Sequence, residues 1–128
     1  MPAEDEVRLA VPATPELLRL ARVTASGVAS RLGFTVDEVE DLRLAIDELC
    51  FALTGGKAQE GALLMNYAVS DDGLEVRATA SFSAHGPEPL LSELSEAILR
   101  ALVDEHEVYR DAGGSPGFRL LKRRYRST

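Results

Sequence analysis

The stretch AIDELCFALTGG, residues 45–56, carries the carboxylate with the clearest potential for chemistry. Glu48 lies beside apolar residues at helical spacing, and a carboxylate next to a buried stripe is unusual. Residues four apart in a helix lie one turn apart on the same face, so Glu48 would share a patch with Ala52. Because Ala52 offers only a methyl group, Glu48 is either half of a site whose other half is missing or the polar edge of the helix.

The histidines and the cysteine do not suggest a metal site. His106 has no partner at metal-ligand spacing, and two histidines with one cysteine do not make a zinc site. Cys50 is interpreted as a small core residue, because no histidine lies nearby in the sequence to activate it. His85 precedes Gly86 in a loop and is either a surface residue or a ligand contact.

Length and charge limit the possible functions. The 128 residues fit a single domain, residues 1–128, with a core of its own. The net charge of -7 argues against nucleic acid as the main partner, because phosphates would be repelled. The basic segment KRRYR, residues 122–126, is therefore interpreted as an exposed strand end, with a docking patch for an acidic partner as the alternative.

The chain shows no sign of a membrane or export segment. It has no run of about 18 apolar residues, and MPAEDEV at its start lacks the basic residues of a secretion signal. The single cysteine excludes an internal disulfide. We expect no membrane partner and a location in the cytoplasm.

Two stretches in the first half of the chain predict amphipathic helices. In the first, Thr14 is a good N-cap, Pro15 suits the first helical position, and Gly33 ends the helix. In the second, Thr35 and Glu38 form a capping box, and two glycines stop the helix. The apolar stripes are Leu17, Ala21, Thr24, Val28 and Leu32 in the first helix, and Val39, Leu42, Ile46, Leu49 and Leu53 in the second.

The other stretches predict strands and a third helix. Residues 6–11 form a short strand, residues 62–69 and 74–82 a hairpin, and residues 107–110 and 118–124 two last strands. The third helix has the apolar positions Leu90, Leu94, Ile98 and Leu102. Helices on one face of a sheet bury all these apolar faces at once. We therefore predict an α+β two-layer sandwich with a mostly antiparallel mixed sheet and helices on one face.

This order of elements, with VEDLRLAIDELC (Val39 to Cys50) on the second helix, resembles the small anti-sigma factors of the gyrase B, histidine kinase and MutL ATPase superfamily. These are bacterial serine-protein kinases that work by partner switching. LARVTASGVASRLG (Leu20 to Gly33) and ALVDEHEVYRDAGGSPGFRLLKRR (Ala101 to Arg124) support the resemblance, which covers nearly the whole chain. It implies the histidine kinase-like ATPase fold, also called the Bergerat fold.

The resemblance gives Glu48 and Ala52 specific positions. In the family, a glutamate on the second helix acts as base toward water or a serine hydroxyl, and an asparagine four residues later holds the magnesium that bridges the ATP phosphates. Glu48 matches the glutamate, and Ala52 stands at the asparagine position. Phosphoryl transfer needs a metal to offset negative charge, and a methyl group cannot bind one. We expect Glu48 to be half of a site without its metal-holding half.

The two glycine-rich nucleotide motifs of the family are also altered. In place of an Asp-x-Gly-x-Gly turn this chain has ATASFSAHGPEP, residues 78–89, which keeps only Gly86 and places His85 beside it. The next helix, LLSELSEAILRALV, has no glycine to bring backbone amides to a phosphate, and its acidic residues would repel an anion. We expect ATP and magnesium to bind weakly or not at all, with Glu48, His85 and Gly86 as the remaining candidates for contact.

The resemblance connects the first helix with protein partners. Arg22 matches an arginine that contacts the sigma factor and its antagonist in the family, and Arg19 lies one turn away on the same face. We therefore predict an anti-sigma-factor-like regulator that binds a sigma factor, a STAS-type anti-anti-sigma protein, or both, through Arg19 and Arg22.

Two alternatives stay open at this point. One is an active ATP-dependent serine-protein kinase that phosphorylates an anti-anti-sigma protein, with Glu48 as base. The other is a small dimerisation module of unrelated function. The sequence does not decide whether the chain forms a homodimer, although exposed faces of the sheet and helices would permit it.

Overall fold

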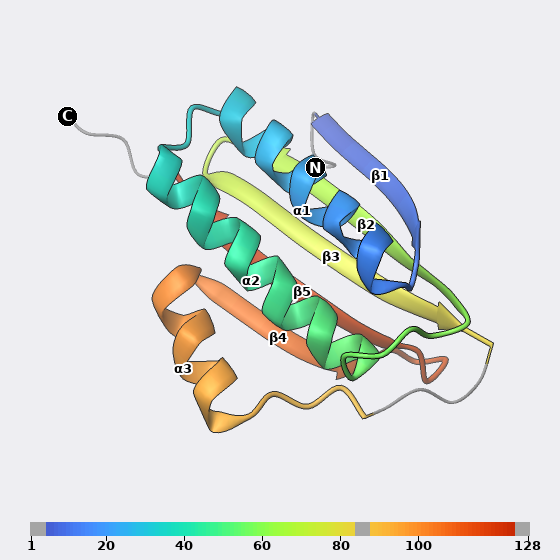
Figure 1. The fold of residues 1–128 in the computed structure, drawn as a ribbon. Helices are drawn as coiled ribbons and strands as arrows, with labels where there is room; N and C mark the ends of the chain where they lie inside the picture. Colours follow the sequence, from blue (N-terminus) through green and yellow to red (C-terminus); the bar gives the residue numbers. More distant parts are fainter. Residues whose placement is uncertain (1–4, 84–87, 125–128) are drawn as a thin grey trace.

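The computed structural model describes residues 5–83 and 88–124. Within this part every predicted helix and strand is present (Figure 1), and only the third helix starts clearly later than the sequence indicated. The order of elements is β1 (Asp5–Pro12), α1 (Pro15–Arg31), α2 (Val36–Thr54), β2 (Gly61–Ser70), β3 (Gly73–Phe82), α3 (Glu93–Leu102), β4 (Glu105–Arg110) and β5 (Pro116–Arg123).

The strands form one sheet in the order β1-β2-β3-β5-β4. Every strand pairing in the described part is antiparallel, so the parallel pair that a mixed sheet would contain is not found there. In the registers, Met65 pairs with Leu9 on β1 and with Ala78 on β3. Side chains alternate between the two faces of a strand, so these three residues lie on the same face of the sheet.

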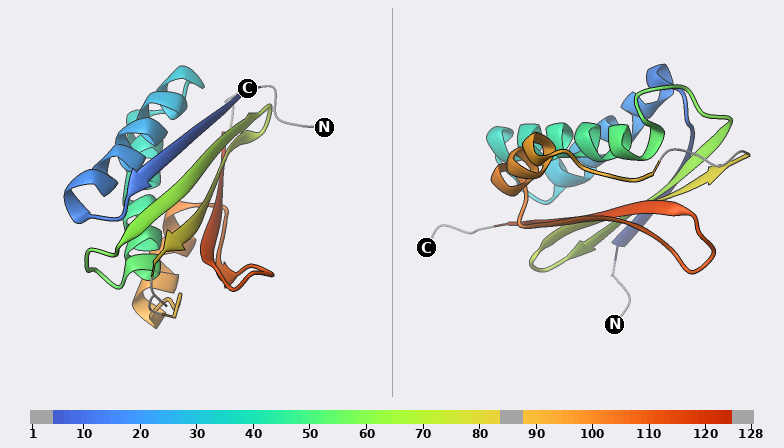
Figure 2. Two further views of the ribbon diagram at one scale, coloured as in Figure 1. Left: turned by 90° about the vertical axis from the view of Figure 1, so that its right-hand side faces the viewer. Right: turned by 90° about the horizontal axis from the view of Figure 1, so that it is seen from below.

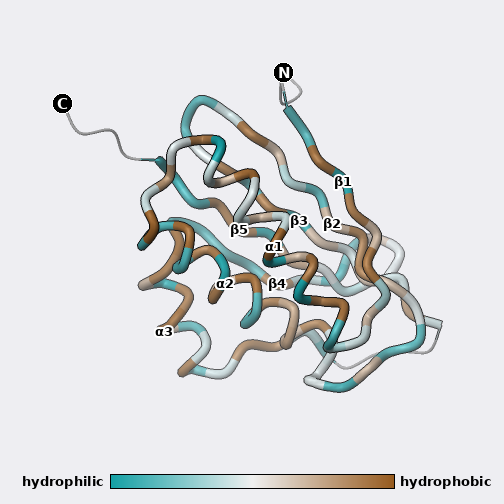
Figure 3. Tube along the Cα trace, turned by 45° about the horizontal axis from the view of Figure 1, so that its top comes forward, coloured by the Kyte–Doolittle hydropathy of each residue, from teal (hydrophilic) through white to brown (hydrophobic). Residues whose placement is uncertain are grey.

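The helices cover one face of the sheet and leave the other face uncovered, as the two views of Figure 2 show. Polar and apolar residues alternate along the chain (Figure 3), as expected where one side of each element faces a core. None of the helices in residues 5–83 and 88–124 is long and apolar enough to cross a membrane. The largest side chains of the core are Tyr67, Phe118, Leu42, Ile46, Leu49, Leu53, Leu63, Leu74, Leu99 and Leu120.

The buried face of α1 differs from the predicted stripe. Its fully buried residues are Ala21, Ala25 and Ala29, whereas Leu17 is 40% exposed. Small side chains allow the helix to approach the sheet closely, and the Tyr67 hydroxyl on β2 donates a hydrogen bond to the Ala21 carbonyl at 2.9 Å. The larger apolar residues are thereby turned toward the flanks and the outer surface of the helix.

The predicted stripe of the third helix is also wrong in part. Ser92 caps α3, so Leu90 lies before the helix, and Leu94 is 70% exposed. Leu99 is the fully buried residue of α3. Because Ser92 caps the helix, α3 starts later than predicted, and its fully buried residue lies in its C-terminal half.

The ends of α2 follow the prediction closely. Thr35 Oγ1 accepts a hydrogen bond from the Glu38 amide at 3.1 Å, and the Glu38 carboxylate accepts one from the Thr35 amide at 2.8 Å. Gly55 closes the helix with φ of 69°, a conformation that glycine adopts without strain. These two ends fix where α2 starts and stops, and therefore which neighbours its polar residues meet.

Residues 122–124 of the basic segment are not the exposed strand end that the sequence suggested, and residues 125 and 126 lie outside the described residues. Lys122 Nζ donates to the Leu102 carbonyl at 2.6 Å, and Arg123 forms an ion pair with Glu105 at 3.0 Å. Arg124 donates to the carbonyl of Leu32. Residues 122–124 are partly buried and tie β5 to the helices and to β4.

Candidate functional site

α3 lies beside α2 (Figure 1), and Glu48 is on the side of α2 that contacts α3. Its Oε2 accepts a hydrogen bond from Ser95 Oγ at 2.9 Å. Ser92 Oγ, at the N-cap of α3, donates to Ser95 Oγ at 3.1 Å and accepts from the Ser95 amide at 3.0 Å. The Glu48 carboxylate is thus the last acceptor of a short hydrogen-bond chain that begins at the start of α3.

Ala52 lies one turn after Glu48 and is 7% exposed. Its methyl group supplies no donor atom to a metal, and residues 5–83 and 88–124 contain no group of three or more His, Cys, Asp or Glu that could hold one. Glu48 can accept a proton or a hydrogen bond, but a metal ligand one turn away is missing. His85 and Gly86 lie outside the described residues, so their predicted contact with a ligand stays a prediction.

The region around α3 is also tied to β4. Glu96 Oε2 lies 3.0 Å from His106 Nε2, and the His106 side chain is largely buried. Ahead of the helix, Glu88 pairs with Arg110 at 3.0 Å. His106 therefore interacts with a carboxylate, and these contacts help to hold α3 and the segment before it beside β4.

The predicted partner-binding arginines lie on the other side of α2. Arg22 Nε is 3.0 Å from Asp47 Oδ1, and Arg22 Nη1 donates to Asp47 Oδ2 at 3.5 Å. Burial raises the pKa of the Asp47 carboxyl, although Arg22 and Arg43 act in the opposite direction. Arg19 is exposed and lines the same cleft between α1 and α2 as Arg22.

The structure does not bring all predicted residues together. Asp47 contacts α1 and Glu48 contacts α3, so the helix α2 separates the arginines from the catalytic candidate. Large apolar side chains are exposed near the arginines, and the most exposed aromatic among them is Phe51, at 62%. The other exposed apolar residues of α1 and α2 include Leu17, Leu20, Val23, Val36 and Leu44.

The sequence analysis did not identify Ser92 and Ser95, which form the hydrogen-bond chain to Glu48, or Asp47, which pairs with Arg22. Ser92 stands three residues before Ser95 at the start of an apolar run, which is a recognisable N-cap signal. The contact of Ser95 with Glu48, 47 residues away, has no signal in one sequence. The ion pair of Asp47 with Arg22 likewise has no signal in one sequence, because the two residues lie on different helices, 25 residues apart.

The predicted core role of Cys50 is confirmed. Its side chain is buried in the main apolar cluster. Burial raises the pKa of the Cys50 thiol to about 12, with a smaller contribution in the same direction from Asp47. The thiol is therefore protonated at neutral pH and is not a nucleophile.

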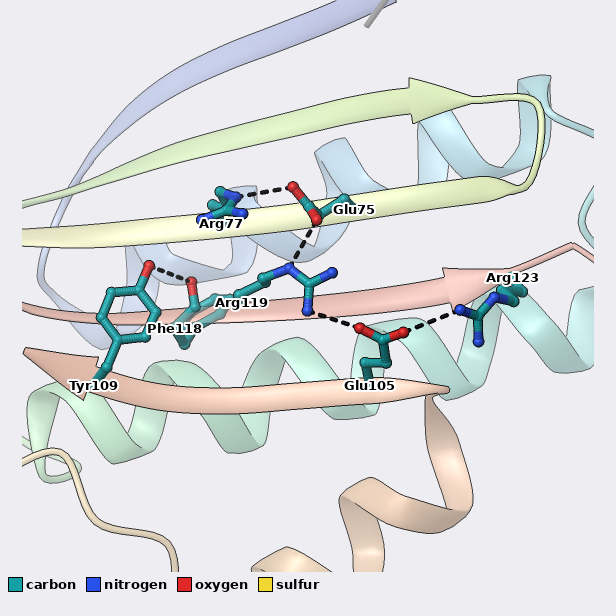
Figure 4. A network of polar contacts seen from close by, with 7 residues as sticks. All are labelled: Glu75, Arg77, Glu105, Tyr109, Phe118, Arg119 and Arg123. Carbon is teal, nitrogen blue, oxygen red and sulfur yellow. Dashed lines mark hydrogen bonds and ion pairs between the residues drawn. The ribbon is translucent and has the colours of Figure 1, made fainter. Parts of the chain in front are cut away.

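The uncovered face of the sheet carries a ladder of alternating charges (Figure 4). Glu75 pairs with Arg77 and with Arg119, each at 2.8 Å, and Glu105 pairs with Arg119 and Arg123, each at 3.0 Å. Burial alone would raise the pKa of Glu75, but hydrogen bonds from Arg77 and Arg119 hold it below the ordinary value. The arginines of this ladder are neutralised within the chain.

Several known proteins with related sequences carry the same name. The serine-protein kinase RsbW of Bacillus subtilis (strain 168) is 31% identical, over 85% of this chain and 81% of that protein. The protein of that name from Bacillus licheniformis is 31% identical, over 87% of this chain and 82% of its own length. The one from Listeria monocytogenes serovar 1/2a is 29% identical, over 87% and 83%. No family model matches the chain. Identity at this level over most of both sequences shows that this chain belongs to the RsbW family of serine-protein kinases.

Proposed function

We propose that this chain is an anti-sigma-factor-like regulator of a bacterial partner-switching system, with an ATP site that has become weak or lost. Its partners would be a sigma factor, a STAS-type anti-anti-sigma protein, or both. The observation that carries the proposal is the contact of Glu48 with Ser95 beside the buried Ala52. A kinase needs its base directed at the hydroxyl of the substrate and a metal on the phosphates, whereas here a hydroxyl of the same chain occupies the carboxylate.

The start of α3 supports a weakened nucleotide site. Glu93 and Glu96 lie in its first turn. Helix N-termini bind phosphates through free backbone amides and a positive dipole end, and carboxylates at that end favour the helix but repel an anion. A nucleotide phosphate that approached this helix would meet negative charge instead of a glycine-rich turn.

The outer surface of α1 and α2 supports the docking of a protein. Protein interfaces are enriched in aromatic residues and arginine and combine them with an apolar centre. Arg19 and Arg22 lie beside exposed Val23 and Phe51 on this surface. A partner with acidic and apolar side chains would match it in both charge and polarity.

Charge reversal tests the docking surface. The double variant Arg19→Glu, Arg22→Glu should bind the sigma factors and STAS-type proteins of the same genome at least roughly tenfold more weakly, as expected when charged anchors are reversed. Biolayer interferometry with the purified partners measures this. Arg8→Glu is the matched control, because Arg8 is an exposed arginine of β1, away from the surface of α1 and α2, that lies 3.5 Å from Glu6. Unchanged affinity of the double variant would contradict the docking proposal.

Titration calorimetry with ATP, with and without magnesium, tests the nucleotide site. We expect no binding at millimolar ATP. Binding in the micromolar range, about -8 kcal/mol, that depends on magnesium would instead favour an active kinase. The relatives are named serine-protein kinases, so an active kinase is the second candidate function. An active kinase must also transfer labelled phosphate to a serine of the partner, and this transfer must be lost in Glu48→Ala.

A further inference from the structure

A cleft of about 230 Å³ opens between α1 and α2, on the side of α2 opposite to the Glu48–Ser95 contact. It is smaller than the pockets that hold drug-sized molecules, which measure roughly 300–1,000 Å³. Its lining combines an apolar part with charged groups of both signs. The residues that matter for binding are Leu18, Cys50 and Phe51 on the apolar part, and Arg19, Arg22 and Asp47 on the charged part.

The hydrogen-bonding capacity of Arg22 is not used up by Asp47. Arg22 Nε lies 3.0 Å from Asp47 Oδ1, but its N–H is not directed at that oxygen, and within the described residues it has no hydrogen-bond acceptor. The one hydrogen bond to Asp47 is long, at 3.5 Å from Nη1. The Arg22 side chain is 32% exposed, but Nε itself is buried, so solvent reaches the side chain at other atoms. A guanidinium carries five donors, and only one of them makes a hydrogen bond within the described residues, which leaves donors of Nη1 and Nη2 for a better acceptor.

The charges in the cleft favour an anion. Arg19 makes no hydrogen bond or ion pair with any residue of the described part. Two guanidinium groups therefore face one carboxylate, and the cleft has an excess of one positive charge although the whole chain carries -7. Arginine recognises planar carboxylates through paired N–H donors. The adjacent apolar side chains would cover a hydrocarbon or aromatic group attached to such a carboxylate.

We propose that this cleft binds a small monocarboxylate with an apolar or aromatic body. The carboxylate would pair with Arg22 and Arg19, and the body would lie against Leu18 and Phe51. The ligand would compete with Asp47 for Arg22, so Asp47 lowers the affinity of the site. This inference goes beyond the proposed function and does not depend on it, because binding can be measured on the isolated chain.

The test compares phenylacetate with its neutral analogue phenylacetamide. Backbone amide shifts of the labelled chain are followed by NMR at low salt, with each compound added up to about 50 mM, which detects Kd values in the millimolar range. Phenylacetate should shift the amides of residues around the cleft with one saturating curve, and phenylacetamide should bind at least about tenfold more weakly because the ion pair is lost. Equal binding of both compounds, or no saturable shift at the cleft, would overturn the proposal.

Two variants with opposite expected effects identify the site. Arg22→Gln should weaken phenylacetate binding at least about tenfold, and Asp47→Asn should strengthen it about threefold or more, because the internal competitor is neutralised. Arg8→Gln, on β1 and outside the cleft, should leave the affinity unchanged. If Arg22→Gln does not fold, the result for Asp47→Asn still decides: unchanged or weaker binding in that variant contradicts the proposed competition.

Discussion

Asp47 and Glu48 are adjacent carboxylates that face different neighbours. Successive residues of a helix point about 100° apart, so Asp47 meets Arg22 on α1 while Glu48 meets Ser95 on α3. In this structure Glu48 is not a free helix edge, because it accepts a hydrogen bond from a hydroxyl group on a neighbouring helix. The sequence could not indicate this contact.

The hydrogen bond between Ser95 and Glu48 should contribute to stability. Ser95→Ala should lower the free energy of unfolding by about 1–2 kcal/mol, because hydrogen bonds to charged groups are worth more than neutral ones. Urea unfolding measures the change. Ser30→Ala, at an exposed position of α1, is the control and should stay within about 0.5 kcal/mol of the wild type. Equal effects of the two variants would show that the contact contributes nothing.

Cys50 should make the fold sensitive to alkaline pH. An unfolded thiol ionises from about pH 8.5, whereas the folded thiol has a pKa of about 12. The unfolded state thus loses its proton first, and stability falls as pH rises by about 1.4 kcal/mol for each pH unit in this window. Urea unfolding from pH 7 to pH 10 measures the slope. The slope should be smaller in Cys50→Ala, and an identical slope in both proteins would contradict the assignment.

At the scale of elements, both ends and most of the buried stripe of α2 follow the prediction, whereas the buried face of α1 and the start of α3 do not. The signals at Thr35 and Gly55 act within a few residues, so the sequence contains the whole interaction. The buried face of α1 depends on how closely the helix approaches β2. Because this approach is close, alanines and not larger apolar residues form the buried face. In α3 the Ser92 cap overrides the apolar spacing that starts at Leu90.

Two threonines test the value of a capping bond within the same protein. Thr35 caps α2 with a side-chain hydrogen bond, whereas Thr14 stands at the N-cap of α1 without one. Thr35→Ala should therefore lower the free energy of unfolding by about 1 kcal/mol, and Thr14→Ala by clearly less. Chemical denaturation of both variants measures the difference. Equal losses would mean that the backbone conformation of the cap matters and its side-chain bond does not.

At the scale of the molecule, the layers could be predicted but the pairing of charges could not. Alternation in the strands and periodicity in the helices indicate one apolar side for each element, and a two-layer sandwich is the arrangement that buries those sides. Ion pairs such as Arg119 with Glu75 join residues 44 positions apart. Lys122 similarly donates a hydrogen bond to the Leu102 carbonyl at the end of α3, although the sequence suggested that it would be exposed to solvent. These contacts follow from the order β1-β2-β3-β5-β4, which no local pattern specifies.

The charge ladder on the uncovered face of the sheet should make the free energy of unfolding decrease at acidic pH. The pKa of Glu75 is lowered by Arg77 and Arg119 against the effect of burial, and the pKa of Glu105 is lowered mainly by the hydrogen bond from Arg119. A carboxyl group with a lowered pKa in the folded state stabilises the fold above its unfolded pKa of about 4.3, and this contribution is lost as pH falls through the folded value.

Arg119 links both carboxylates, so Arg119→Gln should remove much of this contribution. At pH 7 the variant should be less stable, with a loss of about 1 kcal/mol or less from the partly exposed Glu75 pair. The difference from the wild type should shrink as pH falls below about 4, because the carboxyl groups of the wild type become protonated there as well. Urea unfolding at pH 7 and at pH 2.5 measures both differences.

Arg8→Gln is the control for this prediction. It removes an exposed arginine that lies 3.5 Å from Glu6, and it should show no such dependence on pH. A constant difference between wild type and Arg119→Gln at both pH values would mean that Arg119 acts through packing of its hydrocarbon chain and not through its charge.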